Sequence, residues 1–135
     1  MIDVSVIIIN RNTKDLLVSA IKSVANSNVS KEIIVVDNAS EDGSAEMVKK
    51  HFPDVILLQN VTNEKFAKPN NDAVRIAKGR YYFLLNSDAR LCEKALDKLV
   101  KFMDQNPEVA VAGPQLLNPD GTIQSSCRGF ITLWS

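Results

Sequence analysis

Two aspartates follow runs of apolar residues closely, so a sheet would hold both of them in fixed positions. Asp37 comes after residues 33–36, and Asp88 follows the apolar run 82–85 with Asn86 and Ser87 between. Carboxylates bind hard cations such as Mg²⁺ and Mn²⁺, and Mg²⁺ often combines one or two carboxylates with substrate phosphates. The pattern therefore favours metal-assisted binding of a phosphorylated ligand. The alternative is that both aspartates only cap the helices after them.

The elements that would position these residues alternate along the chain. Short apolar segments predict five strands, at residues 4–9, 32–36, 55–58, 81–85 and 109–112. Apolar residues at helical spacing predict four helices, at residues 13–26, 44–51, 69–78 and 93–105. We expect Thr13 to cap the first helix and Gly79 to end the third in a left-handed conformation. The Asn-Pro-Asp-Gly turn at 118–121 predicts a hairpin whose far side is 122–125.

This order of elements predicts an α/β fold, a mostly parallel sheet with flanking helices. The first strand is continuously apolar and β-branched, so it should be central and covered on both faces. Ligands of such sheets bind beyond the carboxyl ends of the strands. Polar groups follow three of the strands, at residues 10–12, 37–38 and 86–88, and they should converge on one crevice.

Length and charge narrow the possible functions. The 135 residues suit a single domain covering 1–135, and 16 basic against 16 acidic residues give no net charge. The sequence has no cluster of Lys and Arg with interleaved aromatic residues, so nothing in it points to nucleic acid as a partner. The longest apolar runs are far shorter than the roughly 20 residues of a transmembrane segment, and no charged leader precedes them. We therefore expect a cytoplasmic chain, whose full-length protein could lie at the inner face of the membrane.

Five segments, taken in order, resemble the successive signatures of family 2 glycosyltransferases, and of rhamnosyltransferase-like members in particular. These segments are residues 4–12, 34–40, 63–71, 82–88 and 113–122, and together they cover nearly the whole chain. The resemblance implies a GT-A fold, the Rossmann-like sandwich of nucleotide-diphospho-sugar transferases. It also implies a donor domain that binds a UDP- or dTDP-linked sugar for inverting transfer to a glycan or lipid-linked acceptor.

The same resemblance implies a role for each of eight residues. Those expected to line the nucleotide are Ile9, Asn10, Arg11 and Asn12. Asp37 would read the base or ribose from outside the core, and Asp88 would ligate the Mg²⁺ or Mn²⁺ that bridges the diphosphate. Lys65 would place positive charge near the diphosphate, and Asn71 would hold the crevice wall.

Three residues depart from the family pattern. Ser87 stands where a fuller motif carries a second acidic residue, so metal binding would rest mainly on Asp88. Lys65 and Asp72 stand where close relatives often have Gly. No catalytic residue is expected in this chain, because the family's base comes from a later segment; we expect the domain to be truncated before it, with the base beyond Ser135.

Two other functions remain open from the sequence. One is a non-catalytic module that binds a nucleotide sugar. The other is a receiver-like signalling domain in which Asp37 is modified. A receiver would need paired acidic residues after its first strand, whereas this chain has Asn10-Arg11-Asn12 there, so signalling is the less favoured reading.

Overall fold

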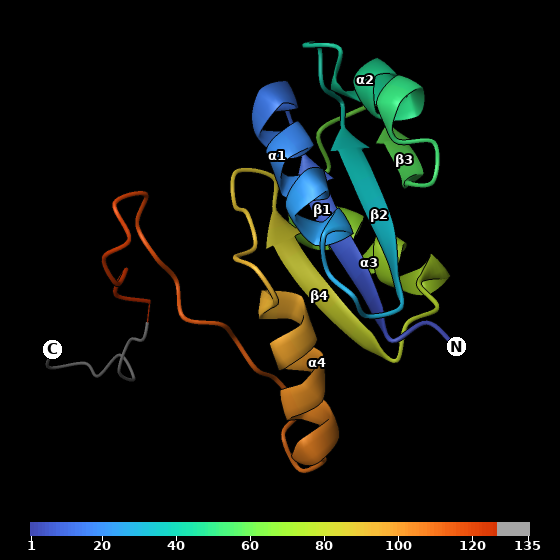
Figure 1. The fold of residues 1–135 in the computed structure, drawn as a ribbon. Coiled ribbons are helices and arrows are strands. Elements are labelled where there is room, and N and C mark those ends of the chain that lie inside the picture. Colours follow the sequence, from blue (N-terminus) through green and yellow to red (C-terminus); the bar gives the residue numbers. More distant parts are fainter. Residues whose placement is uncertain (127–135) are drawn as a thin grey trace, which may run out of the picture.

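The computed structural model describes residues 1–126, which form one sheet with helices on both faces (Figure 1). Strands and helices alternate along the chain as the sequence predicts. The strands are β1 (Val4–Asn10), β2 (Lys31–Asn38), β3 (Ile56–Asn60) and β4 (Tyr81–Asn86). The helices are α1 (Lys14–Ala25), α2 (Ser44–His51), α3 (Ala67–Ile76) and α4 (Ala95–Gln105). None of these helices is long and apolar enough to cross a bilayer.

The sheet has the order β3-β2-β1-β4, and all three strand pairs are parallel. β1 is central, and nearly all of it is buried, because a parallel sheet covers its inner strands on both faces. The predicted central place of the first strand is confirmed. The register sets Asn10 beside Asp37 and Ile9 beside Asn86, so the polar ends of these strands lie along one edge.

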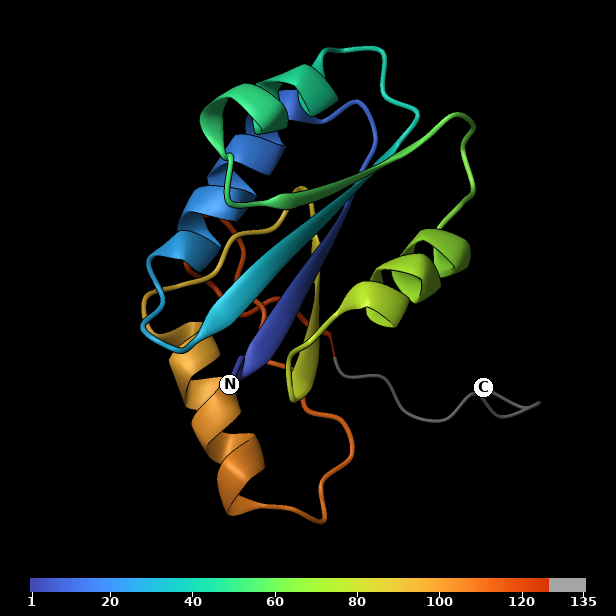
Figure 2. The ribbon, with the colours of Figure 1, turned by 90° about the vertical axis from the view of Figure 1, so that its right-hand side faces the viewer.

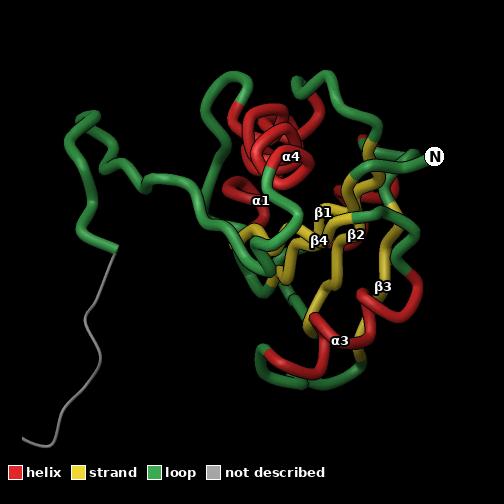
Figure 3. The backbone as a smooth tube through the Cα atoms, turned by 90° about the horizontal axis from the view of Figure 1, so that it is seen from below, coloured by secondary structure: helices red, strands yellow, loops and turns green. Residues whose placement is uncertain are grey.

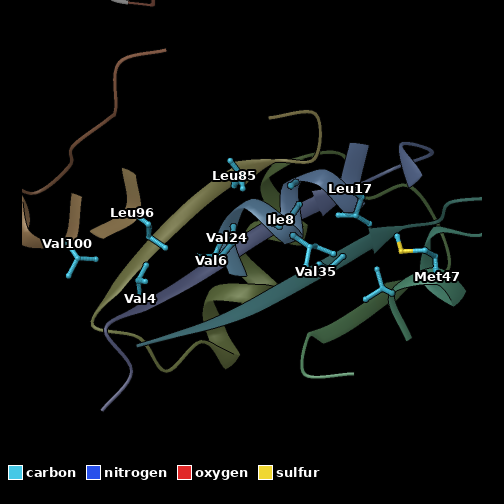
Figure 4. Close-up of a cluster of buried hydrophobic side chains, with 13 residues drawn as sticks. Val4, Val6, Ile8, Leu17, Val24, Val35, Met47, Leu85, Leu96 and Val100 are labelled. Atoms are coloured by element: carbon cyan, nitrogen blue, oxygen red, sulfur yellow. The ribbon is translucent and has the colours of Figure 1, made fainter. Parts of the chain in front are cut away.

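Helices α1, α2 and α4 lie on one side of the sheet, and α3 lies on the other (Figures 2 and 3). Alternate residues of each strand face opposite sides, so β1 contributes to two separate cores. Figure 4 shows the larger core, in which Val6 and Ile8 of β1 gather with Leu17 of α1 and Met47 of α2. The smaller core joins Ile7 to Ala73 of α3. Each fully buried Val, Leu or Ile contributes roughly 1.5–3 kcal/mol, so these cores hold the helices in place.

Gly79 does not adopt the left-handed conformation that the sequence analysis predicts. Within residues 1–126, Gly43 and Gly121 are the glycines with positive φ. α3 ends at Ile76, and Gly79 lies against β1, where an added Cβ would stand 2.4 Å from the backbone nitrogen of Ser5. Its N–H donates to the Ser5 hydroxyl over 2.8 Å. Gly79 is therefore needed for close approach of two chain segments.

The predicted fifth strand is wrong. Residues 109–112 form no strand, and Val111 is largely exposed. Residues 110–112 line a hollow beside β4, but they form no backbone ladder with it, and β4 pairs with β1 alone among the strands of residues 1–126. The predicted hairpin is present in reduced form, as a single antiparallel bridge between Leu117 and Ile123.

Candidate functional site

A hollow of about 340 Å³ opens at the carboxyl edge of the sheet. Residues at the carboxyl ends of β1, β2 and β4 and just beyond β1 and β4 line it, together with the connection from β3 to α3. The predicted convergence of the polar strand ends on one crevice is therefore confirmed. Of the residues predicted to form the site, those that line the hollow are Ile9, Asn10, Arg11, Lys65 and Asp88. Asn12, Asp37 and Asn71 lie elsewhere.

Asn10 ends β1 with its side chain completely buried. Its amide nitrogen donates to Asp37 Oδ1 over 3.0 Å and to Ser40 Oγ over 3.1 Å. Its amide oxygen accepts a hydrogen bond of 2.7 Å from the Thr13 hydroxyl. A buried amide with all these partners is fixed in orientation, so Asn10 ties the ends of β1 and β2 together.

Asp37 is only 3% exposed and lies behind the hollow, next to Asn10. Its second carboxylate oxygen accepts the Ser40 N–H over 3.1 Å. The expectation that this carboxylate stands outside the core is therefore wrong, because it is buried and hydrogen-bonded to Asn10 and to the Ser40 N–H of the loop after β2. An ionised carboxylate can accept about four hydrogen bonds, so capacity remains for a ligand at the rim.

Thr13 occupies the N-cap position of α1, as predicted, but its hydroxyl makes no capping hydrogen bond. The hydroxyl points instead to Asn10 and lies 2.8 Å from Ser87 Oγ, on the loop after β4. The first amide of the helix, that of Lys14, donates to Asp42 over 2.9 Å. The helix start is thus satisfied by another residue, and Thr13 belongs to the hollow.

Asp42 serves two helices with one carboxylate. One oxygen accepts the Lys14 N–H of α1, and the other accepts the backbone N–H and the hydroxyl of Ser44, at the start of α2. Partial desolvation acts to raise the pKa of Asp42, but the hydrogen bonds from Ser44 and Lys14 outweigh it and leave the pKa below its ordinary value. The negative charge also suits the positive ends of both helix dipoles.

The loop after β1 combines an exposed cation with a strained backbone. Arg11 is exposed and lines the hollow. Asn12 has a left-handed φ of 53°, which Asn tolerates better than most residues. Its backbone N–H donates to Ser40 Oγ over 3.0 Å, and its side-chain oxygen accepts the Glu41 N–H over 2.8 Å. Asn12 therefore braces the loop, and Arg11 is the one of the two that lines the hollow.

Asn38 holds the wall formed by the connection from β3 to α3. Its amide nitrogen donates to Asn63 Oδ1 and to the Lys65 carbonyl, both over 2.8 Å. Its amide oxygen accepts from Asn60 Nδ2 over 3.1 Å and from the Glu64 N–H over 2.9 Å. All four hydrogen-bonding positions of this buried side chain are used, so the segment around Lys65 is fixed relative to β2.

Lys65 itself has a φ of 63°, in the left-handed region where a side chain costs about 1–3 kcal/mol. Glycine adopts a positive φ without steric cost, which explains why glycine would suit this position in the family pattern described above. The side chain is exposed and lines the hollow beside Phe66. Lys65 therefore delivers a cation to the site from a strained position.

Asn71, predicted to hold the crevice wall, is exposed and outside the lining. Its neighbour Asn70 is the buried residue, and its amide donates to the Phe66 carbonyl over 2.8 Å at the start of α3. A one-residue step along a helix turns a side chain by about 100°, so neighbouring asparagines face different surroundings. Sequence spacing alone does not predict which of the two asparagines holds the wall.

Asp88 is exposed at the mouth of the hollow, two residues beyond β4. Among residues 1–126, no group donates a hydrogen bond to the Asp88 carboxylate, and no basic side chain forms a salt bridge with it. No cluster of three His, Cys, Asp or Glu side chains that could hold a metal occurs in this part of the chain either. The donor set fits a hard cation bound by one carboxylate together with ligand phosphates, and it does not fit an all-protein metal cage.

A second hollow, of about 270 Å³, lies between β4, α4 and residues 110–112. Its one cation, Arg80, is already held by Asp3 and Asp104, each over 2.8 Å. The Arg80 guanidinium and the Tyr81 hydroxyl hold the pKa of Asp104 below its ordinary range. These groups tie α4 to the start of β4, so the cation of the second hollow is already used to hold the fold together. The first hollow, at the carboxyl edge of the sheet, is lined by more polar residues and is called the polar hollow below. It is the better candidate for ligand chemistry.

The lining residues missed by the sequence analysis are Thr13, Asn63 and Phe66, whereas Asn38, Asn86 and Ser87 were expected at the crevice without an assigned contact. All but Thr13 fall within the five segments that carry the family resemblance, so their positions were recognisable but their contacts were not. Thr13 gives no signal beyond that of a helix cap, because the position and residue type fit capping equally well.

The model of the family described as Glycosyl transferase family 2 matches residues 5–126. Among curated proteins, the chain is 32% identical over 110 residues to the poly(ribitol-phosphate) beta-glucosyltransferase of Bacillus spizizenii. That match covers 76% of this chain and 17% of the relative, so the chain spans about a sixth of the relative's length.

Two solved structures have the same fold. S. aureus TarS 1-349 in complex with UDP-GlcNAc aligns with a TM-score of 0.71 at 26% identity, covering 78% of this chain and 32% of that one. The mannosyltransferase PcManGT from Pyrobaculum calidifontis, in complex with GDP-Man and Mn²⁺, aligns with a TM-score of 0.69 at 26% identity. That alignment covers 74% of this chain and 32% of the other. The predicted α/β sandwich of the GT-A type is confirmed by these likenesses.

Proposed function

The chain belongs to glycosyl transferase family 2, and from that premise we propose that its polar hollow binds the nucleoside diphosphate of a sugar donor. One observation carries the proposal. Arg11 and Lys65, two exposed cations, and Asp88, one exposed carboxylate, line a single hollow at the carboxyl edge of the sheet. Cations attract the diphosphate, and the carboxylate offers a ligand for a counter-cation. The UDP-GlcNAc and GDP-Man complexes of the structural neighbours support this assignment.

At the nucleotide end, Asp37 is proposed to accept a hydrogen bond from the base or the ribose of a UDP- or dTDP-linked donor. Its carboxylate is held in place by Asn10 and the Ser40 N–H, so it need not reorganise when the nucleotide arrives. A receiver would need paired acidic residues after its first strand, whereas this chain has Asn10-Arg11-Asn12 there. The receiver-like alternative is therefore not favoured.

At the diphosphate end, Asp88 is proposed to hold Mg²⁺ or Mn²⁺ jointly with the phosphate oxygens. A cation bound there would offset the negative charge that develops on the leaving nucleoside diphosphate. Lys65 and Arg11 would add positive charge from the chain itself, and positive charge near the leaving group lowers the barrier to its departure.

The sugar transfer is proposed to be inverting, with a glycan or lipid-linked acceptor attacking the anomeric carbon opposite the nucleotide. Such attack needs a carboxylate base near the acceptor hydroxyl. Within residues 1–126, Asp88 is the one acidic side chain that lines the hollow. We therefore place the base and the acceptor site outside this part of the protein.

The proposal is tested by titrating the purified chain with UDP and with GDP in a calorimeter, with Mn²⁺ and with EDTA. We expect binding that tightens in Mn²⁺, and we expect Asp88→Asn to remove this tightening because a neutral amide holds a hard cation poorly. The matched control is Asp120→Asn, since Asp120 lies in the hairpin turn and its contacts are to Thr122. Equal Mn²⁺ dependence in Asp88→Asn and the native chain would refute the metal assignment.

A further inference from the structure

Thr13 connects the two ends of the hollow through its hydroxyl. On one side it contacts the amide oxygen of Asn10, whose amide nitrogen in turn contacts Asp37. On the other side it contacts Ser87, the neighbour of Asp88 in the chain. Four side chains from β1, β2, the start of α1 and the loop after β4 thus form one continuous line of hydrogen bonds.

The direction of every bond in this line follows from chemistry. The Asp37 carboxylate and the amide oxygen of Asn10 only accept, so Asn10 donates to Asp37 and Thr13 donates to Asn10. A threonine hydroxyl carries one proton, so the Ser87 hydroxyl must donate to Thr13 across their 2.8 Å contact. The contact with Asp37 therefore fixes the orientation of the Ser87 hydroxyl through two intermediate groups, Asn10 and Thr13.

This orientation matters at the mouth of the hollow. With its proton directed toward Thr13, the Ser87 oxygen presents lone pairs to its other side, where it lines the hollow with Asp88. Ser87 is 9% exposed, so few other orientations are open to it. Hydrogen bonds in a chain polarise one another, so a change at Asp37 is transmitted to Ser87 and a change at Ser87 to Asp37.

We propose that Thr13 is a positioning residue that couples nucleotide recognition at Asp37 to diphosphate and cation binding at Ser87 and Asp88. The absence of a capping bond supports this role, because the hydroxyl gives up the usual stabilisation of α1 to make these contacts. The inference rests on the function proposed above. It goes beyond that function in assigning a coupling between two parts of the site and a residue that carries it.

The coupling is measured as the ratio of UDP affinities in Mn²⁺ and in EDTA. Thr13→Val keeps the side-chain shape and removes the hydroxyl. We expect the ratio of UDP affinities in Mn²⁺ and in EDTA to be at least fivefold smaller in this variant than in the native chain. Fivefold is the low end of the range for coupled sites. Thr13→Ser restores the hydroxyl, and we expect it to recover most of the enhancement.

Ser23→Ala is the matched control for a purely structural effect. Ser23 also joins α1 to the segment after β4, because its hydroxyl accepts the Leu91 N–H over 3.0 Å, but it lies outside the hollow. We expect Ser23→Ala to lower the melting temperature and to leave the Mn²⁺ enhancement unchanged.

The outcomes separate the inference from the proposed function. If the native chain binds UDP more tightly in Mn²⁺ and Thr13→Val keeps the same ratio, the coupling is refuted and the proposed function stands. If Ser23→Ala lowers the ratio as much as Thr13→Val, the effect is one of stability and the coupling is refuted. If the native chain binds neither UDP nor GDP under any condition, both proposals fall.

Discussion

Lys65 affects the site through both its charge and its backbone, and substitutions can separate the two. Its carbonyl and N–H are held by Asn38 and Asn63, so its left-handed backbone persists whatever the side chain. We expect Lys65→Gly to raise the melting temperature, since relief of strain, about 1–3 kcal/mol, exceeds the added entropy cost of glycine, about 0.5–1 kcal/mol.

The same variant should weaken UDP binding several-fold, because it removes a cation from the hollow that we propose to bind the diphosphate. Lys65→Met is the control: it removes the charge and keeps the strain, so it should weaken binding equally without raising the melting temperature. Calorimetry and thermal unfolding measure the two effects. A Lys65→Gly chain that melts at a lower temperature than the native chain would contradict the strain argument.

The sequence predicted which residues meet at the hollow better than it predicted how they meet. Asn10, Lys65 and Asp88 follow strands whose ends share one edge, and that arrangement depends only on parallel pairing. The burial of Asp37 and the partners of Thr13 depend on contacts with residues far away in the chain. Residue type and spacing carry no record of such contacts, so a helix cap and a positioning residue look alike.

Among the elements, the contact between Gly79 and β1 gives a direct test of packing. A methyl group at Gly79 would stand 2.4 Å from Ser5 N and 2.7 Å from Val4 C, both backbone atoms of the central strand. We expect Gly79→Ala to destabilise the fold by about 1–3 kcal/mol, as overpacking does. Urea denaturation measures this loss.

Gly113→Ala supplies the control for that substitution. An added Cβ at Gly113 meets nothing within 4 Å, so stability should change by no more than about 0.5 kcal/mol. Equal losses in the two alanine variants would show that close packing at Gly79 is not the cause.

The starts of α1 and α2 share Asp42, which makes stability depend on pH. The pKa of Asp42 is lower in the folded chain than its ordinary 3.8, so its contribution is fully present above that value and is lost as pH falls through the folded pKa. We expect Asp42→Asn to be less stable than the native chain at pH 7, since the amide lacks the charge that suits both helix dipoles.

The difference between Asp42→Asn and the native chain should shrink as the pH is lowered through 3.8 and below, where the native carboxyl also becomes neutral. Melting temperatures of both proteins across this range measure it. A difference that stays constant down to pH 2 would mean that the carboxylate charge has no part in holding the helices.

Element positions were predictable wherever a segment has a partner in the sheet. The four strands that pair carry apolar runs, and each lies within two residues of its expected place. The segment 109–112 carries a similar run but pairs with no strand of the sheet, and strand propensity is expressed only on a packed, paired surface. Pairing is a property of the tertiary arrangement, so the sequence alone overpredicts one strand.

For the molecule as a whole, we expect donor binding without transfer. The hollow is proposed to bind a nucleotide, a diphosphate and a cation, but no acidic side chain of residues 1–126 besides Asp88 lines it. A positioned base contributes about 10²–10⁴ in rate, and acceptor positioning contributes more. The purified 135-residue chain should therefore bind UDP or GDP and yield no glycosylated acceptor. Acceptor-dependent product, detected by mass spectrometry at a rate typical of enzymes, would overturn this expectation.

The central place of β1 also affects how the chain can fold while it is being synthesised. Of the four strands, β1 leaves the ribosome first. Its partner β2 follows within about 30 residues, whereas its partner β4 follows only after about 80 residues. At a synthesis rate of about 5–20 residues per second, the longer interval takes several seconds. During that interval one edge of an apolar, β-branched strand has no neighbour, and such edges readily pair with other chains. The strand that is most completely enclosed in the finished protein is therefore the one most in need of cover while the nascent chain is still growing.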